Sequence, residues 1–210
     1  VLENVLVAPE NPAAVLEAMA DPGVRIVSLT VTEKGYCHNP ATGALTVDHP
    51  DIAHDLQQEM PRSAPGFLVR ALARRRAAGV PPFTILSCDN LPENGALVRQ
   101  IVLDFAHLID PSLAQWIGEN GQFPATMVDR ITPATTPVDI ARVTAVTGLY
   151  DSAPVLHEPF RQWVIEDNFV NDLRRDFAAV CVGMVDDVTS LEQMKLRLLN
   201  GSHSSLAYLV

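Results

Sequence analysis

The amino-acid sequence predicts an α/β fold built as a doubly wound parallel sheet. Two stretches, 24–32 and 82–89, are β-branched and almost continuously apolar, which is typical of strands covered on both faces. Each stretch follows an apolar-periodic segment that has the start and stop signals of a helix. Helices and strands therefore alternate along the chain, and this alternation favours a parallel sheet with helices packed on it.

The elements before the second strand are recognised by their end signals. Asn11-Pro12 supplies an N-cap and a proline at the first helical position, and Asp21-Pro22-Gly23 ends that short helix. The segment 35–50 contains many turn-forming residues, so we expect a surface excursion there. A long helix is expected over 64–78, because Gly79 and two prolines close that periodic stretch.

The second predicted strand ends in a polar pair, Asp89-Asn90. Open parallel sheets bind their ligands at the carboxyl ends of the strands, so the pair marks a candidate site. We expect the carboxyl ends of the two strands to lie side by side, with four residues at a common opening: Thr32, Glu33, Asp89 and Asn90. The elements expected further along are helices over 95–109, 112–120, 137–146 and 188–209, a short strand over 126–128, a mixed segment over 154–165 and a strand over 177–185.

Composition and charge exclude several classes of function. The 210 residues are 48% hydrophobic and 19% charged, which is typical of a globular chain. The net charge is −10 and no basic stretch exceeds Arg74-Arg75-Arg76, so neither nucleic acid nor a membrane is an expected partner. Without a membrane-length apolar run or a signal-peptide pattern, the expected location is cytoplasmic. The widely spaced Cys37, Cys88 and Cys181 are expected to be reduced structural thiols, and no metal is expected.

The last predicted helix carries a group of residues with catalytic potential. Lys195 is one of only two lysines in the chain. On an α-helix Asn200 lies about 140° and His203 about 80° around the axis from Lys195, so all three can face one side. A partly desolvated lysine can act as a general base, while asparagine can donate to a developing oxyanion. An amphipathic helix with a snorkelling lysine shows the same pattern, and the spacing alone leaves both interpretations open.

Two further polar groups also have a structural and a functional interpretation. Asp89-Asn90 with Asn94 is typical of an Asx-turn before a helix N-cap, yet its place at a strand end suits a ligand site. Asp129 with Arg130 is either an ion pair at a strand end or a carboxylate that tunes a nearby acid or base. The residue pattern does not decide between these alternatives.

Five stretches, taken in chain order, resemble the polyol-specific long-chain dehydrogenases, the family that includes the mannitol 2-dehydrogenases and the D-mannonate oxidoreductases or fructuronate reductases. They cover nearly the whole chain, and the last has a specific spacing of lysine, asparagine and histidine. The stretches are VSLTVTEKGYC (27–37), FTILSCDNLPENG (83–95), FPATMVDRITPATTP (123–137), EPFRQWVIEDNF (158–169) and MKLRLLNGSHSSLAYL (194–209).

The resemblance implies a zinc-independent, NAD-linked interconversion of a secondary alcohol and a ketone. Lys195 matches the catalytic lysine of the family and would take or give the hydroxyl proton. Asn90 and Asn200 match the two asparagines that polarise the carbonyl and hold the alkoxide-like oxygen. His203 would fix the substrate, and Asp129 would assist proton exchange at the lysine.

The resemblance also names the cofactor and the kind of substrate. NAD is the expected cofactor, and a sugar acid or polyol is the expected small-molecule partner. The residues expected to bind the cofactor are Thr32, Glu33 and Asp89. The residues expected to bind the substrate are Asn90, Arg161, Asn200 and His203.

Two segments, 33–37 and 158–169, resemble the D-mannonate oxidoreductase branch more than the mannitol branch. The planar fork of Arg161 suits the carboxylate of a hexuronate, although an ion pair with Glu158 or Asp167 is the alternative. The expected reaction interconverts D-mannonate and D-fructuronate. The alternatives are the mannitol 2-dehydrogenase reaction, between mannitol and fructose, and a chain that keeps the motifs without turnover.

The chain also departs from the family pattern in its domain organisation. The family begins with a strand and a glycine-rich GxGxFxR turn, and residues 1–30 contain no such turn. We therefore expect a partial Rossmann-like dinucleotide-binding domain over 1–187, followed over 188–210 by the first helix of a truncated all-helical substrate domain. Such a chain is expected to bind a dinucleotide weakly or not at all when isolated.

Overall fold

The computed structural model of the chain describes residues 3–209, except for the side chains of Asn200, His203 and Leu209. In chain order its elements are α1 (Pro12–Ala20), β1 (Ile26–Leu29), α2 (Thr32–Gly35), α3 (Pro50–Gln57), α4 (Ala64–Ala77), β2 (Thr84–Ser87), α5 (Asn94–Ile109), α6 (Pro111–Asn120), β3 (Thr126–Asp129), α7 (Pro137–Thr147), β4 (Gln162–Glu166), η1 (Val170–Asp172), η2 (Ala178–Val180), β5 (Gly183–Val185), α8 (Thr189–Met194), η3 (Lys195–Asn200) and α9 (Gly201–Leu209). Of these, η1 and η2 are 3₁₀ turns and η3 is a π-helical segment.

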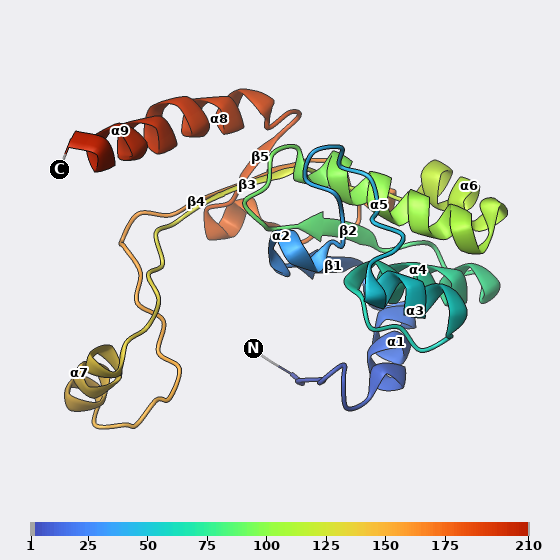
Figure 1. Ribbon diagram of the computed structural model, residues 1–210, viewed down its shortest axis with the longest axis horizontal. Helices are drawn as coiled ribbons and strands as arrows, with labels where there is room; N and C mark the ends of the chain where they lie inside the picture. Colours follow the sequence, from blue (N-terminus) through green and yellow to red (C-terminus); the bar gives the residue numbers. More distant parts are fainter. Residues whose placement is uncertain (1–2, 210) are drawn as a thin grey trace.

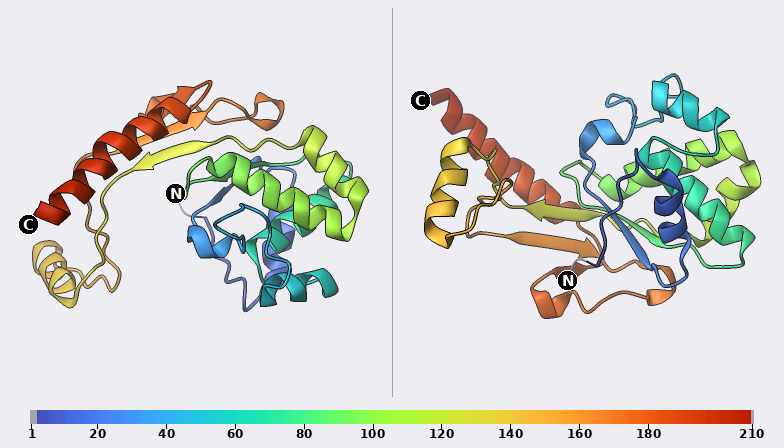
Figure 2. Two further views of the ribbon diagram at one scale, coloured as in Figure 1. Left: turned by 45° about the horizontal axis from the view of Figure 1, so that its top comes forward. Right: turned by 90° about the horizontal axis from the view of Figure 1, so that it is seen from below.

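The molecule consists of a helix-rich body and a long arm (Figure 1). In the body, α1, α3, α4, α5 and α6 surround β1 and β2, whereas α7 lies at the tip of the arm. The segments α8, η3 and α9 form one rod that runs beside the strands leading to the arm (Figure 2). Within residues 3–209, no helix is both long enough and apolar enough to cross a membrane.

The strands β1 and β2 are parallel neighbours. Ile26 pairs with Thr84 and Leu29 with Ser87, and a backbone bond from Cys88 N to the Leu29 carbonyl (2.8 Å) extends the pairing by one residue. The prediction that the carboxyl ends of these strands lie side by side is confirmed. This edge of the sheet is where a parallel α/β fold places its ligands.

The strands β3, β4 and β5 form a separate mixed sheet. β3 is antiparallel to β4, and β4 is parallel to β5, so the prediction of one wholly parallel sheet is wrong in this part. Between β3 and β4 the chain runs out along the arm and returns to the same end of the sheet, which produces an antiparallel pair (Figure 1). β2 and this sheet are joined by a shared apolar cluster that includes Leu86 and Ile165, and by a side-chain bond in which Thr126 Oγ1 donates to the Ser87 carbonyl at 2.6 Å.

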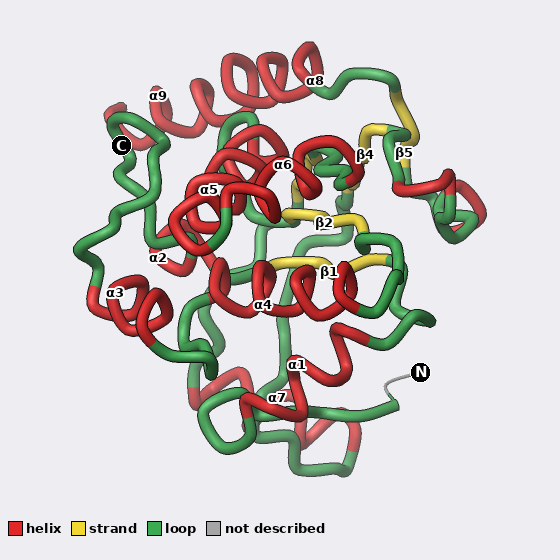
Figure 3. Tube along the Cα trace, turned by 90° about the vertical axis from the view of Figure 1, so that its right-hand side faces the viewer, coloured by secondary structure: helices red, strands yellow, loops and turns green. Residues whose placement is uncertain are grey.

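The main hydrophobic core lies in the body, where α1, α4 and α5 gather around β1 and β2 (Figure 3). Burial of a large apolar side chain stabilises a fold by about 1.5–3 kcal/mol. The arm contributes little of this kind, since α7 has no buried residue. Fully buried core side chains include Leu16, Val69, Leu72, Ile85, Val102, Phe105 and Ile117.

The helices predicted over 64–78, 95–109 and 112–120 are confirmed as α4, α5 and α6. The strand predicted over 177–185 is wrong in its first part, where η2 forms instead, and only Gly183–Val185 is extended as β5. Cys181, between η2 and β5, has a φ of 64°, in the left-handed region that a regular strand excludes.

The helix predicted over 188–209 is present as the rod from α8 to α9, but its middle is not an α-helix. η3 is π-helical, with hydrogen bonds from residue i to i+5. Five residues span about one turn of a π-helix, so backbone position 200 returns toward the face of position 195 instead of lying about 140° away. π-Helical turns occur often at functional sites, and this one begins at Lys195.

Candidate active site

A cleft of about 600 Å³ opens between the carboxyl ends of β2 and β3 and the rod that carries Lys195. Polar and charged residues of four separate segments converge on it, and Trp163 and Leu199 supply apolar surface. Four of the residues that the sequence analysis singled out line this cleft: Asn90, Asp129, Arg161 and Lys195.

Lys195 ties the rod to the ends of two strands. Its half-buried ammonium group donates to Asn90 Oδ1 at 2.9 Å and to the carbonyl of Val128. Because Oδ1 of Asn90 accepts from the lysine, the Nδ2 group of that amide is the part able to donate to another oxygen. An amine, which is a group able to transfer a proton, and an amide donor therefore lie within one hydrogen bond of each other.

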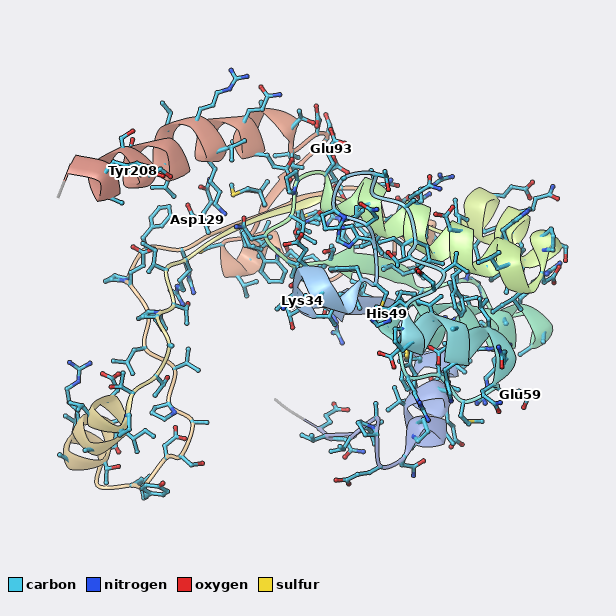
Figure 4. All side chains as sticks on the ribbon, in the orientation of Figure 1. Lys34, His49, Glu59, Glu93, Asp129 and Tyr208 are labelled. Carbon is cyan, nitrogen blue, oxygen red and sulfur yellow. The ribbon has the colours of Figure 1, made fainter. Side chains whose placement is uncertain are left out.

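Asp129 ends β3 at the point where the chain leaves the body and the arm begins (Figure 4). Its neighbour Arg130 donates from Nε to the Phe160 carbonyl at 3.1 Å. Among residues 3–209, no ion pair joins Asp129 to Arg130, so the structure does not support the strand-end ion pair. The carboxylate lines the cleft beside the Val128 carbonyl that Lys195 contacts.

Arg161 is exposed and also lines the cleft. The two acids that the sequence offered as its ion-pair partners are engaged elsewhere. Glu158 Oε1 accepts from Ile131 N at 2.7 Å, and Asp167 receives two hydrogen bonds from Arg174, at 2.5 and 2.7 Å. The Arg174 guanidinium holds the pKa of the Asp167 carboxyl below its usual range.

The charge of the cleft differs in sign from that of the chain. Arg130, Arg161 and Lys195 contribute three cations, and Asp129 contributes one carboxylate, whereas the whole chain has a net charge of −10. A locally positive cleft in an acidic protein attracts anionic ligands.

The residues expected to bind the cofactor are not all brought together. Asp89 and Asn90 line a cavity of about 290 Å³ next to the cleft, while Glu33 lines a different cavity with Glu93. The backbone of Thr32 is bound to Asp89, with its amide donating to Oδ1 at 3.0 Å. The expectation of one common opening therefore holds for Asp89 and Asn90 but not for Glu33, which lines the other cavity, or for Thr32, which lines neither.

Asn94 has the structural role that its sequence pattern allowed, although not as a helix N-cap. Its buried amide donates to the carbonyls of Asp89 (3.0 Å) and Thr126 (2.9 Å), and its Oδ1 accepts from Thr126 N (2.9 Å). Asn94 thus joins the end of β2 to the start of β3. The cap position is taken by Glu93, which has a left-handed φ of 48°.

Asn200 and His203 lie in η3 and α9, but their side chains are outside the described part of the structure. Two residues that sequence reasoning missed, Trp163 and Cys181, line the cleft. Trp163 lies inside one of the family-like stretches, which is the only signal the sequence offers for it.

The three cysteines are expected to differ sharply in reactivity. Burial raises the pKa of the Cys37 and Cys88 thiols to about 11, and the Asp89 carboxylate adds to the effect at Cys88. Cys181 is exposed at the cleft. Since the thiolate is the nucleophile, iodoacetamide at pH 8 should alkylate Cys181 at least about 100-fold faster than Cys37 or Cys88. Mass spectrometry of the folded protein checks this, and equal labelling of Cys88 would contradict the described burial.

Comparison with known proteins adds a family to this geometry. Residues 2–177 match the family model described as the mannitol dehydrogenase Rossmann domain. The chain is 56% identical over 196 residues to an uncharacterized oxidoreductase, YdfI, of Escherichia coli strain K12, and 54% identical over 196 residues to the D-mannonate oxidoreductase of the same strain. Each match covers 93% of this chain and 40% of the relative.

A solved structure supports the same assignment. The ternary complex of Pseudomonas fluorescens mannitol 2-dehydrogenase with NAD and D-mannitol superposes with a TM-score of 0.91 and 45% sequence identity, over 99% of this chain and 42% of that protein. The predicted Rossmann-like fold class is confirmed by these matches. The chain spans about two fifths of the length of the curated relatives it matches.

Proposed function

Because this chain belongs to the mannitol dehydrogenase family, we propose that the whole protein is an NAD-dependent oxidoreductase that interconverts D-mannonate and D-fructuronate. The observation that carries the proposal is the hydrogen bond between Lys195 and Asn90 in a cleft that Asp129 and Arg161 also line. One relative that is named for this substrate, the E. coli D-mannonate oxidoreductase, is 54% identical.

NAD, when bound, supplies or accepts the hydride. The volume of the cleft, about 600 Å³, lies in the usual range of ligand sites, and its position at the carboxyl ends of the strands fits the nicotinamide end of a dinucleotide. Thr32 and Glu33, which follow β1, are the residues proposed to face the cofactor. Asp89 would act through the loop after β1, since its carboxylate already accepts three hydrogen bonds from the chain.

Lys195 would move the proton of the reacting hydroxyl group. In the oxidation direction its amine takes the proton from the alcohol, and in the reduction direction the ammonium returns it to the oxygen of the former ketone. Asn90 would donate from Nδ2 to the same oxygen and stabilise negative charge as it develops. Asp129, at the edge of the cleft, would accept the proton that Lys195 must release before the next cycle.

The charge of the cleft favours a sugar acid over a neutral polyol. Arg161 has no acidic partner among the described ion pairs, and Arg130 is bound only to a backbone carbonyl among the described contacts. A guanidinium with free donors suits a carboxylate, because the two can form paired charge-assisted hydrogen bonds. A neutral hexitol would leave that charge without a counter-ion.

A substrate panel on the whole protein tests this function. D-Fructuronate, D-tagaturonate and D-fructose are offered with NADH and with NADPH, and reduction is followed by loss of the nicotinamide absorbance. We expect D-fructuronate with NADH to give the highest kcat/KM. Preference for D-fructose would assign the protein to the mannitol reaction, and no turnover with any pair would favour a non-catalytic role.

Replacing Arg161 with leucine is expected to weaken use of the sugar acid selectively. Loss of a charge-assisted hydrogen bond costs about 1.5–3 kcal/mol, so kcat/KM for D-fructuronate should fall about 10- to 150-fold while that for D-fructose changes little. Arg142→Leu is the control, because Arg142 is exposed on α7 and pairs with Asp139. An equal fall in kcat/KM for both substrates would mean that Arg161 does not bind the carboxylate of the sugar acid.

A further inference from the structure

We propose that Asp89 is a positioning residue that holds Asn90 in place against Lys195. The inference rests on the proposed function, in which Asn90 and Lys195 act on the same substrate oxygen. Asp89 immediately precedes Asn90; it lines the adjoining cavity of about 290 Å³ but not the cleft of about 600 Å³ that holds Arg161 and Asp129. Its effect on the reaction would therefore be exerted through its neighbour.

The Asp89 carboxylate accepts three hydrogen bonds from the segment that follows β1. Oδ1 accepts from Thr32 N at 3.0 Å, and Oδ2 accepts from Val31 N at 3.0 Å and from the Tyr36 hydroxyl at 2.6 Å. Hydrogen bonds to an ionised acceptor are about twice as strong as neutral ones. Backbone pairing of β1 with β2 ends at Leu29, and beyond that residue the Asp89 carboxylate connects the two chain segments.

This connection holds a strained turn. Thr32 has a φ of 62°, a left-handed conformation that a β-branched residue rarely adopts and that costs about 1–3 kcal/mol. The bond from its amide to Asp89 offsets that cost. Tyr36 is buried, and its burial raises the pKa of the hydroxyl above the ordinary value, so the group keeps the proton that it donates to Asp89.

The backbone of Asp89 is anchored from the opposite side. The buried amide of Asn94 donates to the Asp89 carbonyl at 3.0 Å and to the Thr126 carbonyl at 2.9 Å. Asp89 is therefore fixed to the β1 loop by its side chain and to β3 by its main chain. Asn90 itself is exposed, and its described side-chain hydrogen bond is the one from Lys195. The position of the Asn90 amide therefore depends on how Asp89 is held.

The geometry also explains why Asp89 is a weaker candidate for direct cofactor binding. A carboxylate offers about four lone-pair sites, and three of them are already used by the chain. A role in holding the loop accounts for all three contacts, whereas contact with a ligand accounts for none of them.

The test replaces Asp89 with asparagine, which keeps the shape but turns one acceptor oxygen into a donor. We expect kcat of the whole protein to fall about 10- to 100-fold with little change in KM, because a displaced catalytic group slows the chemical step more than binding. The matched control is Ser87→Ala, which removes the other partner of the Tyr36 hydroxyl at 2.7 Å without touching Asp89. A purely structural role would lower kcat of both variants in proportion to their loss of stability, and that result would overturn the proposal.

A second readout does not depend on turnover. Lys195 is half-buried and bound to Asn90, whereas Lys34, the other lysine of the sequence, is exposed on α2. Acylation by acetic anhydride, followed by mass spectrometry, gives the labelling rate of Lys195 relative to Lys34. We expect this ratio to rise several-fold in Asp89→Asn and to stay at the parent value in Ser87→Ala.

The two readouts separate the possible failures. If the whole protein turns over no sugar acid or polyol, the proposed function fails, while the labelling ratio still decides whether Asp89 positions the pair. If Asp89→Asn does not fold, Tyr36→Phe removes one of the three bonds and should change the ratio in the same direction by a smaller factor. An unchanged labelling ratio in whichever of these variants folds would overturn the proposal.

Discussion

Lys195→Ala is expected to lower turnover of the whole protein by about 10²–10⁴-fold, which is the usual contribution of a positioned acid–base group. The reason is that the ammonium group lies at the cleft and donates to Asn90 Oδ1 at 2.9 Å, whereas Lys34, the other lysine, does not line that cleft. Cofactor affinity should change little, because loss of proton transfer does not alter the nucleotide contacts. Steady-state kinetics combined with NADH titration measures both quantities.

Lys195→Arg should be almost as inactive, because a guanidinium stays protonated and cannot serve as a base. Small primary amines added to the alanine variant should restore part of the activity if they enter the vacated space. Lys34→Ala is the matched control, since Lys34 is exposed on α2. Turnover of the Lys195 variants within a factor of about two of the parent would identify Lys195 as an ordinary surface residue.

Gly95→Ala is expected to destabilise the fold strongly, with a loss of about 2–3 kcal/mol in the free energy of unfolding. A Cβ at this position would lie 2.4 Å from the Phe123 carbonyl oxygen and 2.7 Å from Ala125 N. Both atoms belong to the backbone, so the first turn of α5 and the segment before β3 would have to move apart. Urea unfolding followed by circular dichroism measures the change.

Gly118→Ala is the matched control, because its Cβ would meet only side-chain atoms at 3.7 Å or more, in the last turn of α6. At that position the higher helix propensity of alanine should raise the free energy of unfolding by about 0.5–1 kcal/mol. The Gly95 variant should also lose activity, since its neighbour Asn94 anchors the Asp89 carbonyl. Equal stability of the two alanine variants would show that α5 is not packed so closely against the segment before β3.

Local sequence signals were sufficient for the elements of the body and for several site residues. Strand and helix signals predicted β1, β2, α4, α5 and α6, because each is a continuous apolar pattern with its own end residues. The family-like stretches predicted that Asn90, Asp129, Arg161 and Lys195 belong to one site, and all four line the cleft. Asn90 and Asp129 lie at the carboxyl ends of β2 and β3, Arg161 directly precedes β4, and Lys195 begins η3. At such positions the place in the element largely decides the place in space.

Only the tertiary structure decided three other features, because each depends on contacts between segments far apart in the chain. β4 runs antiparallel to β3 since the arm returns to the end of the sheet that it left. The carboxylate of Asp89 accepts hydrogen bonds from a loop 57 and 58 residues earlier in the sequence, a contact that no local pattern specifies. Helical spacing places Lys195 on a face of its helix, but the π-helical turn and the bonds to Asn90 and Val128 determine where its ammonium group lies. Sequence periodicity specifies which face of an element is apolar, whereas hydrogen bonds across the fold choose the partner of each polar group.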